Sequence, residues 1–229
     1  MTIKEFTQKL KKIKKQGYIP TKRRGPTGVG YTLEELLNME ENNIALPDLA
    51  KAELKAHRDG SGSMITLFTF NNKVWKTDPI GAIRKYGSND KNGRRGMYYT
   101  MSLKPNSAGL FLEIGNQEIG VSHISGEKIA VWKLEKLEER FEQKIPALVL
   151  VHAFSEERDG REYFHYDRAS LLQGTSPSIL KNQFKKEHLL VDVRMHDKGT
   201  KGARNHGTAF RVKEDKLSFL FERVTDLGI

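Results

Sequence analysis

The residues of this chain best suited to chemistry lie close to residue 50. Asp48 follows Pro47, and Glu53 and Lys55 stand in the segment 52–56, where charged residues alternate with small or apolar ones. Successive side chains of a β-strand point to opposite faces, so Glu53 and Lys55 share one face of the predicted strand. Asp48 precedes Glu53 by five residues, and a turn there can bring the two carboxylates together.

Two carboxylates beside a lysine suit a magnesium ion, a hard cation that prefers carboxylate oxygens and keeps several waters. Such an ion lowers the pKa of a bound water and neutralises charge developing on a phosphate. Lys55 would hold or activate the attacking water and stabilise the oxyanion, and Glu34 on the preceding helix could assist from the same cleft. This predicts phosphodiester hydrolysis. The alternative is an ordinary exposed strand, because Glu-x-Lys triplets are frequent by chance.

The charge balance is consistent with a polyanionic partner. The chain has 39 Lys and Arg against 29 Asp and Glu, a net charge of +10. Net charge alone is weak support, but the excess is concentrated in residues 1–24 and 194–213. The two basic regions are therefore candidates for contact with nucleic acid, although most lysines of the first are expected to form the solvated face of a helix, with only a minority contacting phosphate.

Composition also excludes several classes of site. The absence of cysteine rules out disulfides, thiolate zinc sites and cysteine nucleophiles, and it favours a reducing, cytoplasmic location. No apolar run approaches the roughly 20 residues that span a bilayer. The chain also lacks the P-loop, GxGxxG, HExxH and GxSxG signatures.

The elements that must position these residues indicate a mixed α+β protein. Apolar residues recur at helical intervals over 3–13, and Thr2 with Glu5 has the spacing of a capping box. Residues 22–30 read as a flexible basic loop, and Thr32 with Glu35 predicts a second capped helix. Turn residues at 59–63 predict a hairpin joining the strand at 52–56 to one at 64–70. Helices are expected at 134–143 and 179–184, and strands at 109–114, 119–122, 129–132, 147–153, 163–166, 189–195, 208–212 and 217–221.

One strand near the C-terminus predicts a surface that reads DNA. Alternation buries one side of 189–195 and leaves Asp192, Arg194 and His196 on the other. Arginine bonds guanine O6 and N7, aspartate accepts from cytosine N4, and asparagine or histidine can read other base edges. The candidate DNA-binding residues are Asp192, Arg194, Arg204, Asn205, His206, Arg211, Lys198, Lys201, Arg23 and Arg24.

These candidates have alternative interpretations. We expect Arg194 and His206 to contact bases and the lysines to contact phosphates, although the lysines could simply solvate a loop. The histidines are scattered without the spacing of zinc ligands, and His152 and His165 fit strand patterns as structural residues.

The segment around Pro47, Asp48, Glu53 and Lys55 resembles the PD-(D/E)XK nuclease motif. Its surroundings are similar to the MvaI/BcnI family of restriction endonucleases, relatives of the nicking enzyme MutH, with MvaI the closer branch. The similar segments are 25–34 (GPTGVGYTLE), 53–56 (ELKA), 67–70 (LFTF) and 204–211 (RNHGTAFR). One departure is the sequence at 50–52 (AKA), where a glycine is expected before the catalytic strand.

The resemblance implies a PD-(D/E)XK core, a mixed sheet flanked by helices as in MutH, in a catalytic lobe at 1–145, with a β-rich recognition lobe at 146–229. It implies Asp48, Glu53 and Lys55 as the catalytic set with Glu34 assisting. Mg²⁺ would be held by Asp48, Glu53 and the Leu54 backbone carbonyl, and Ca²⁺ would support binding without cleavage.

The same resemblance implies a type II restriction endonuclease. It would be a monomer that cuts double-stranded DNA at a CC-N-GG site, with CCWGG favoured, and a cognate DNA methyltransferase would occur in the same cell. The alternatives are a MutH-like strand-nicking endonuclease and a non-catalytic sequence-specific DNA-binding protein, although no helix-turn-helix signature is present.

Overall fold

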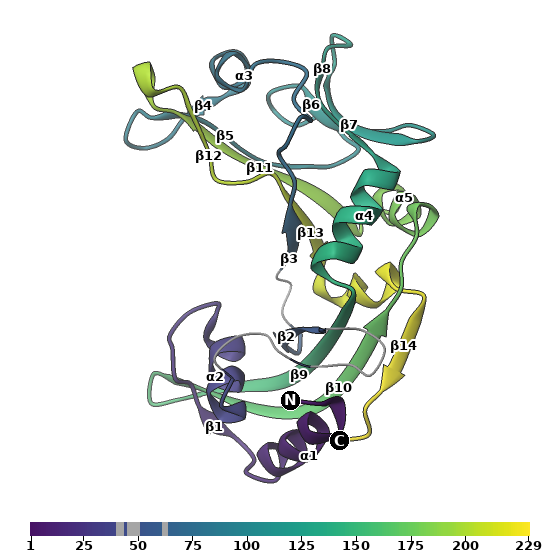
Figure 1. The fold of residues 1–229 in the computed structure, drawn as a ribbon. Coiled ribbons are helices and arrows are strands. Elements are labelled where there is room, and N and C mark those ends of the chain that lie inside the picture. Colours follow the sequence, from purple (N-terminus) through teal and green to yellow (C-terminus); the bar gives the residue numbers. More distant parts are fainter. Residues whose placement is uncertain (40–43, 45–50, 61–63) are drawn as a thin grey trace. The chain divides into compact units, whose positions relative to one another are not determined.

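A computed structural model describes residues 1–39, 44, 51–60 and 64–229 (Figure 1). The chain forms two compact units. Unit 1 contains residues 1–63, 142–174 and 221–229, and unit 2 contains residues 64–141 and 175–220. This differs from the predicted division at residue 145, because unit 1 is assembled from three separate segments. Composition along a chain cannot show such interleaving, since distant strands join one sheet only through tertiary pairing.

Unit 1 contains the two helices that the sequence predicted in its first 40 residues. The helix α1 (Ile3–Lys14) begins with the predicted capping box, in which the Thr2 and Glu5 side chains each bond the other's backbone. The helix α2 (Gly28–Leu37) begins four residues before Thr32, so the predicted capping box there is wrong. Thr32 lies inside the helix, where its hydroxyl accepts a bond from the Lys22 backbone N–H at 2.9 Å.

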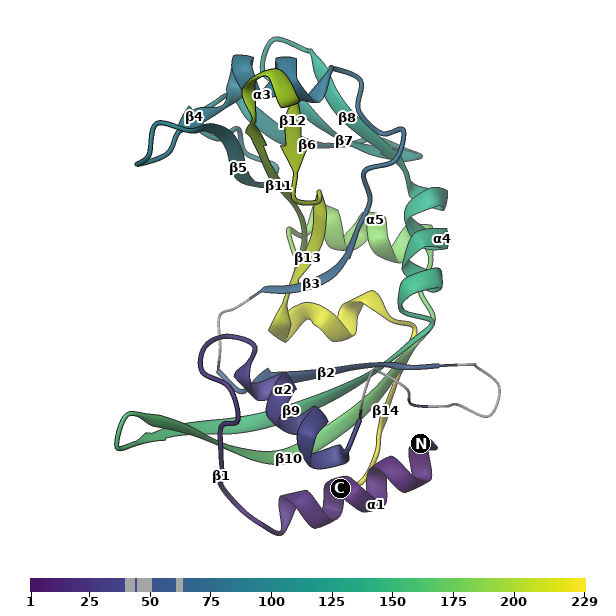
Figure 2. The ribbon, with the colours of Figure 1, turned by 60° about the vertical axis from the view of Figure 1, so that its left-hand side comes forward.

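The sheet of unit 1 has the order β1–β10–β9–β2, and β14 also pairs with β10. The strand β2 pairs in parallel with β9, and the other pairs are antiparallel. Apolar residues of α1 and α2 pack on one face of this sheet, which includes Leu54 and Val149. The two helices lie beside the long β9–β10 pair in Figure 2. The strands are β1 (Ile19–Pro20), β2 (Glu53–Arg58), β9 (Ala147–Arg158), β10 (Arg161–Gln173) and β14 (Arg223–Asp226).

The predicted hairpin between β2 and the next strand, β3 (Met64–Thr69), is wrong. The strand β3 belongs to unit 2 and pairs antiparallel with β13 (Ala209–Lys213), whereas β2 pairs with β9. Each strand thus finds its partner more than 80 residues away in the sequence. Local turn residues favour a hairpin, but the burial of apolar faces against distant strands decides the pairing.

Unit 2 contains one sheet of order β3–β13–β11–β5–β4, with β12 beside β11, and a second of order β6–β7–β8. Its aromatic core includes Phe210, whose ring lies 5.1 Å from that of Phe68 and 5.5 Å from that of Trp132. The remaining strands are β4 (Ser88–Asn89), β5 (Arg95–Met101), β6 (Leu110–Ile114), β7 (Glu118–His123), β8 (Lys128–Lys133), β11 (Leu189–Asp197) and β12 (Ala203–Asn205).

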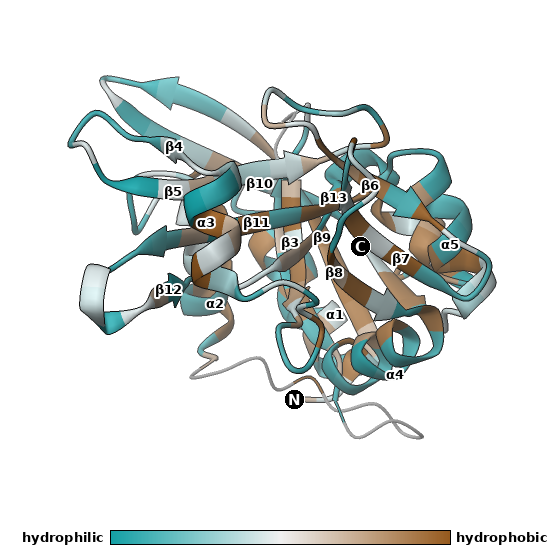
Figure 3. Ribbon diagram, turned by 90° about the horizontal axis from the view of Figure 1, so that it is seen from above, coloured by the Kyte–Doolittle hydropathy of each residue, from teal (hydrophilic) through white to brown (hydrophobic). Residues whose placement is uncertain are grey.

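The later helices are α3 (Pro79–Tyr86), α4 (Leu134–Lys144), α5 (Pro177–Lys185), η1 (Gly199–Lys201) and η2 (Glu214–Leu220). Figure 3 shows teal and brown residues alternating along α4, as expected of a helix that buries one side. Residues 214–220 form a 3₁₀ helix where the sequence predicted a strand at 217–221. The mixed α+β class is confirmed, and no helix among the described residues is long and apolar enough to span a membrane.

Candidate active site

Glu53 and Lys55 lie side by side on β2, as their spacing predicted. The Lys55 Nζ donates to Glu53 Oε1 at 3.0 Å, and the side chains are 24% and 27% exposed respectively. Leu54, between them, turns its side chain into the core on the opposite face. The pair is therefore accessible to a substrate while the strand that carries it is anchored by packing.

The other members of the predicted catalytic set are Glu34 and Asp48. Glu34 lies on α2, which packs against β2, and its side chain is half-buried. No hydrogen bond or ion pair joins it to Glu53 or Lys55 within the described part of the chain. Asp48 lies outside the described residues. The strand β2 pairs with β9, and the Asp59 N–H just after it donates to β9, so by alternation the Leu54 backbone faces away from β9.

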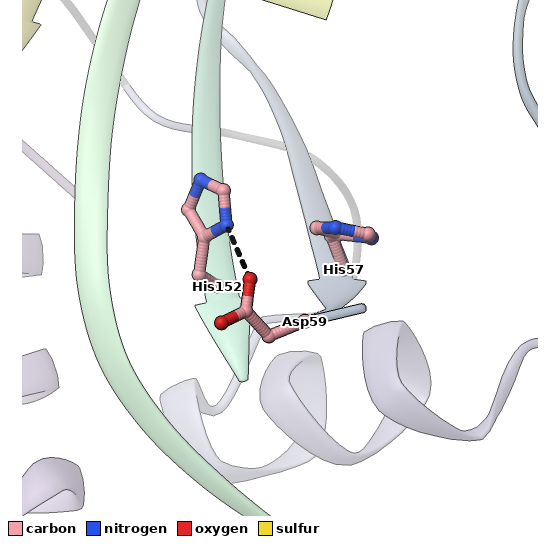
Figure 4. Close-up of side chains that lie close together, drawn as sticks. All are labelled: His57, Asp59 and His152. Atoms are coloured by element: carbon pink, nitrogen blue, oxygen red, sulfur yellow. Dashed lines mark ion pairs between the residues drawn. The ribbon is translucent and has the colours of Figure 1, made fainter. Parts of the chain in front are cut away.

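The polar face of β2 continues past Lys55 to His57, two residues further along the strand. The parallel register places His57 directly opposite His152 of β9. The two imidazole rings lie edge to face with centroids 5.4 Å apart. Figure 4 shows Asp59, just after β2, with its carboxylate between the two histidines.

Asp59 links this group to a third strand. Its Oδ2 accepts from Arg168 Nη2 of β10 at 2.9 Å, and its Oδ1 lies 3.9 Å from His152 Nδ1. Burial, with a contribution from the neighbouring His152, lowers the pKa of His57 to about 4. Burial, followed by the positive charge of Arg168, also lowers the pKa of His152. Both imidazoles are therefore neutral at physiological pH.

Sequence reasoning missed this group and interpreted His152 as a structural residue. The one available signal was local, because the segment 53–57 (ELKAH) repeats polar residues at intervals of two. His152 is 95 residues further along the chain, and only the pairing of β2 with β9 brings it to His57.

In unit 2, the face of β11 predicted to read DNA is largely covered. Asp192 is 1% exposed, and its Oδ1 accepts from Thr100 Oγ1 at 2.7 Å. Its Oδ2 accepts from Arg194 Nε at 2.8 Å and from Arg211 Nη1 at 3.0 Å. Both carboxylate oxygens are thus engaged within the protein. These contacts hold Asp192 inside unit 2, because β11 is an inner strand of the sheet, and its contact with cytosine stays a prediction.

Arg194 and His206 reach the surface of unit 2. The side chain of Arg194 is 51% exposed although its guanidinium is held by Asp192. His206 is exposed, and its Nε2 lies 3.1 Å from Nδ1 of the buried His196. That same His196 atom lies 3.2 Å from the Tyr98 hydroxyl. His196 of β11 thus contacts both His206 and Tyr98.

The remaining candidates divide between the two units. In unit 2, Arg204, Lys198 and Lys201 are exposed, whereas the Asn205 amide oxygen accepts from the Gly207 backbone N–H at 2.8 Å. In unit 1, Arg23 and Arg24 are exposed, and the Arg23 guanidinium lies 3.9 Å from the centre of the Tyr31 ring.

Comparison with known proteins identifies the family to which the chain is similar. The model of the MvaI/BcnI restriction endonuclease family matches residues 7–221. The solved structure of a complex of restriction endonuclease MvaI with cognate DNA is 24% identical, covers 98% of each chain, and has a TM-score of 0.75. The structure of MvaI without DNA is also 24% identical, covers 98% of this chain and 96% of that one, and has a TM-score of 0.59. A search of curated proteins found no match.

Proposed function

The chain belongs to the MvaI/BcnI restriction endonuclease family, and from that membership we propose that it cuts both strands of DNA at a short specific site in a magnesium-dependent reaction. The resemblance found in the sequence is thereby confirmed, and the class is that of a type II restriction endonuclease. We assign hydrolysis to unit 1, through a PD-(D/E)XK set, and sequence reading to unit 2. A CC-N-GG site, with CCWGG favoured, and a cognate methyltransferase belong to the same proposal.

The Glu53–Lys55 pair is the observation that carries this proposal. The two side chains form a contact at 3.0 Å on an anchored strand and remain about a quarter exposed. In the proposed role, the Lys55 ammonium holds the attacking water and stabilises negative charge on the phosphate as it develops. Glu53 orients that ammonium through Oε1. Glu34, on the helix that packs against β2, assists from behind the pair.

The donor set fits a magnesium ion. Among the described residues, Lys55 is the hydrogen-bond partner of the Glu53 carboxylate and engages Oε1 only, so Oε2 remains available to a cation. We propose Asp48 and the Leu54 carbonyl as the further ligands, which gives the all-oxygen set that Mg²⁺ prefers. A bound Mg²⁺ would activate a water and neutralise charge on the phosphate and the leaving oxygen.

Recognition of the DNA sequence is proposed to depend on Arg194 and His206. The buried carboxylate of Asp192 holds the Arg194 guanidinium at 2.8 Å, so the arginine is preorganised before DNA arrives. A guanidinium held in this way can present its remaining N–H groups to guanine O6 and N7. Asp192 thus has a positioning role in this proposal.

The test of the proposed function is cleavage of a supercoiled plasmid in Mg²⁺. If the enzyme acts as a monomer with one active site, nicked circles should appear before linear product, and cleavage should then give discrete bands. Concerted cutting by a species that sediments as a dimer would contradict the monomer proposal. Reaction that stops at nicked circles would favour a MutH-like nickase, and an intact plasmid would refute the nuclease proposal.

Base reading and phosphate contact should separate in variants of unit 2. Arg194→Ala and His206→Ala should each cost about 1–3 kcal/mol on the cognate site and leave non-specific affinity nearly unchanged. Lys198→Ala and Lys201→Ala should weaken binding to all sequences and reduce the salt slope by about one unit, because each lysine releases condensed counterions. The measurement is affinity in Ca²⁺ for cognate and mismatched duplexes at several salt concentrations. Equal losses on cognate and random DNA for Arg194→Ala and His206→Ala would move the reading surface elsewhere, most simply to the loop carrying Arg23 and Arg24.

A further inference from the structure

The group formed by His57, Asp59 and His152 takes no part in the proposed hydrolysis, although it shares a strand with Glu53 and Lys55. We propose that these three residues form a binding site for a divalent cation of the zinc type, separate from the position at Glu53. Because the backbone rises about 3.3 Å per residue in a strand, His57 lies about 6.6 Å beyond Lys55 along β2.

The backbone places all three side chains together. The parallel register pairs His57 with His152, and the next backbone bond, from the Asp59 N–H to the Ala153 carbonyl at 2.8 Å, fixes Asp59 beside β9. A site on a hydrogen-bonded ladder is held more rigidly than one on a loop. His57 and His152 therefore meet through the sheet itself, and Asp59, in the turn after β2, is joined to β9 by its backbone N–H.

The distances suit a metal ion after small side-chain rotations. One ligand atom from each residue lies within 4.8 Å of the other two. Tetrahedral zinc with ligands at 2.0–2.2 Å needs separations of about 3.3 Å between them. For Asp59 Oδ1 and His152 Nδ1, which are already 3.9 Å apart, a small side-chain rotation closes this difference.

The chemistry of the donors selects the class of ion. A histidine binds a metal through a neutral imidazole nitrogen, and both rings lie on neighbouring strands within reach of the Asp59 carboxylate. Two imidazoles and one carboxylate suit Zn²⁺, Co²⁺ or Ni²⁺, whereas Mg²⁺ prefers oxygen ligands throughout. The mixed set here and the carboxylates proposed for hydrolysis therefore favour different ions.

The surroundings of Asp59 and His152 also favour metal binding by the two side chains over an ion pair between them. The 3.9 Å between His152 Nδ1 and Asp59 Oδ1 is too long for a hydrogen bond, and this shielded Nδ1 makes none within the described part of the chain. Arg168 binds only Oδ2 of Asp59, which leaves Oδ1 directed toward His152. Such second partners commonly orient a metal-binding carboxylate. His152 and Asp59 are 25% and 35% exposed, so an ion can enter from solvent.

The test is a titration of the untagged, metal-free protein with CoCl₂ in the absence of DNA, followed by displacement with ZnCl₂. We expect a visible d–d absorption band from one Co²⁺ per chain that Zn²⁺ removes, and a rise in Tm with Zn²⁺. Asp59→Asn and His152→Gln should each weaken binding by about tenfold or more. Both residues are partly exposed, so the variants should fold, and circular dichroism of each variant is the check.

Two control variants distinguish this site from the proposed magnesium position and from the histidine pair of unit 2. Glu53→Gln, at the proposed magnesium position, should retain the d–d band that Zn²⁺ removes, and so should His206→Gln, which disrupts the histidine pair of unit 2. An unchanged d–d band in Asp59→Asn and His152→Gln would overturn the proposal, as would loss of that band in Glu53→Gln or His206→Gln alone. The outcome is independent of the proposed function, which plasmid cleavage in Mg²⁺ tests separately.

Discussion

Glu53→Ala and Lys55→Ala are each expected to lower the rate of DNA cleavage by about a thousandfold or more while leaving DNA binding in Ca²⁺ nearly intact. Both side chains are proposed to act on the scissile phosphate, and they contribute little to the surface that holds DNA. Asp48→Ala should have the same effect if it supplies the second carboxylate. The measurement is single-turnover cleavage of a cognate duplex in Mg²⁺, with affinity determined separately in Ca²⁺.

A second lysine in an ion pair provides the control for loss of charge. Lys128 pairs with Glu118 at 2.9 Å on neighbouring strands of unit 2, in a contact as short as that of Lys55 with Glu53. Lys128→Ala removes the same charge and should leave the cleavage rate unchanged. Turnover near the wild-type level in Glu53→Ala or Lys55→Ala would remove that residue from the catalytic set.

Asp192→Asn is expected to lower the free energy of unfolding by about 3 kcal/mol, the lower end of the range for breaking a buried ion pair. The carboxylate is 1% exposed, whereas its partner Arg211 is 24% exposed and Arg194 is half-exposed, so solvent compensates part of the loss. Denaturant unfolding with linear extrapolation measures the change. The same variant should also reduce discrimination between cognate and mismatched DNA, because Arg194 is no longer held.

The control for Asp192→Asn lies on the same strand. Asp197 pairs at 3.0 Å with Arg84, whose side chain is 59% exposed. Asp197→Asn should therefore cost about 1 kcal/mol or less, as is usual for surface ion pairs. Equal destabilisation by the two variants would show that the buried network around Asp192 does not stabilise unit 2 as proposed.

Local features of the chain were predictable from the sequence by itself. The alternation at 52–56 placed Glu53 and Lys55 on one face of a strand, and the spacing of Thr2 and Glu5 predicted the cap of α1. Both predictions depend only on residues close in sequence, whose periods of 2.0 and 3.6 follow from backbone geometry. The family resemblance likewise came from short segments, and the family model confirmed it.

Features that depend on distant residues were decided only by the tertiary structure. The alternation along β11 correctly separated its two faces, but only the tertiary structure shows that Arg211 and Thr100 donate hydrogen bonds to the Asp192 carboxylate. The turn at Asp59 favoured a hairpin, yet β2 pairs with β9 and thereby brings His57 to His152. The physical reason is the same in both cases. A strand's own sequence specifies which side chains share a face, whereas its neighbours in the sheet determine what those side chains meet.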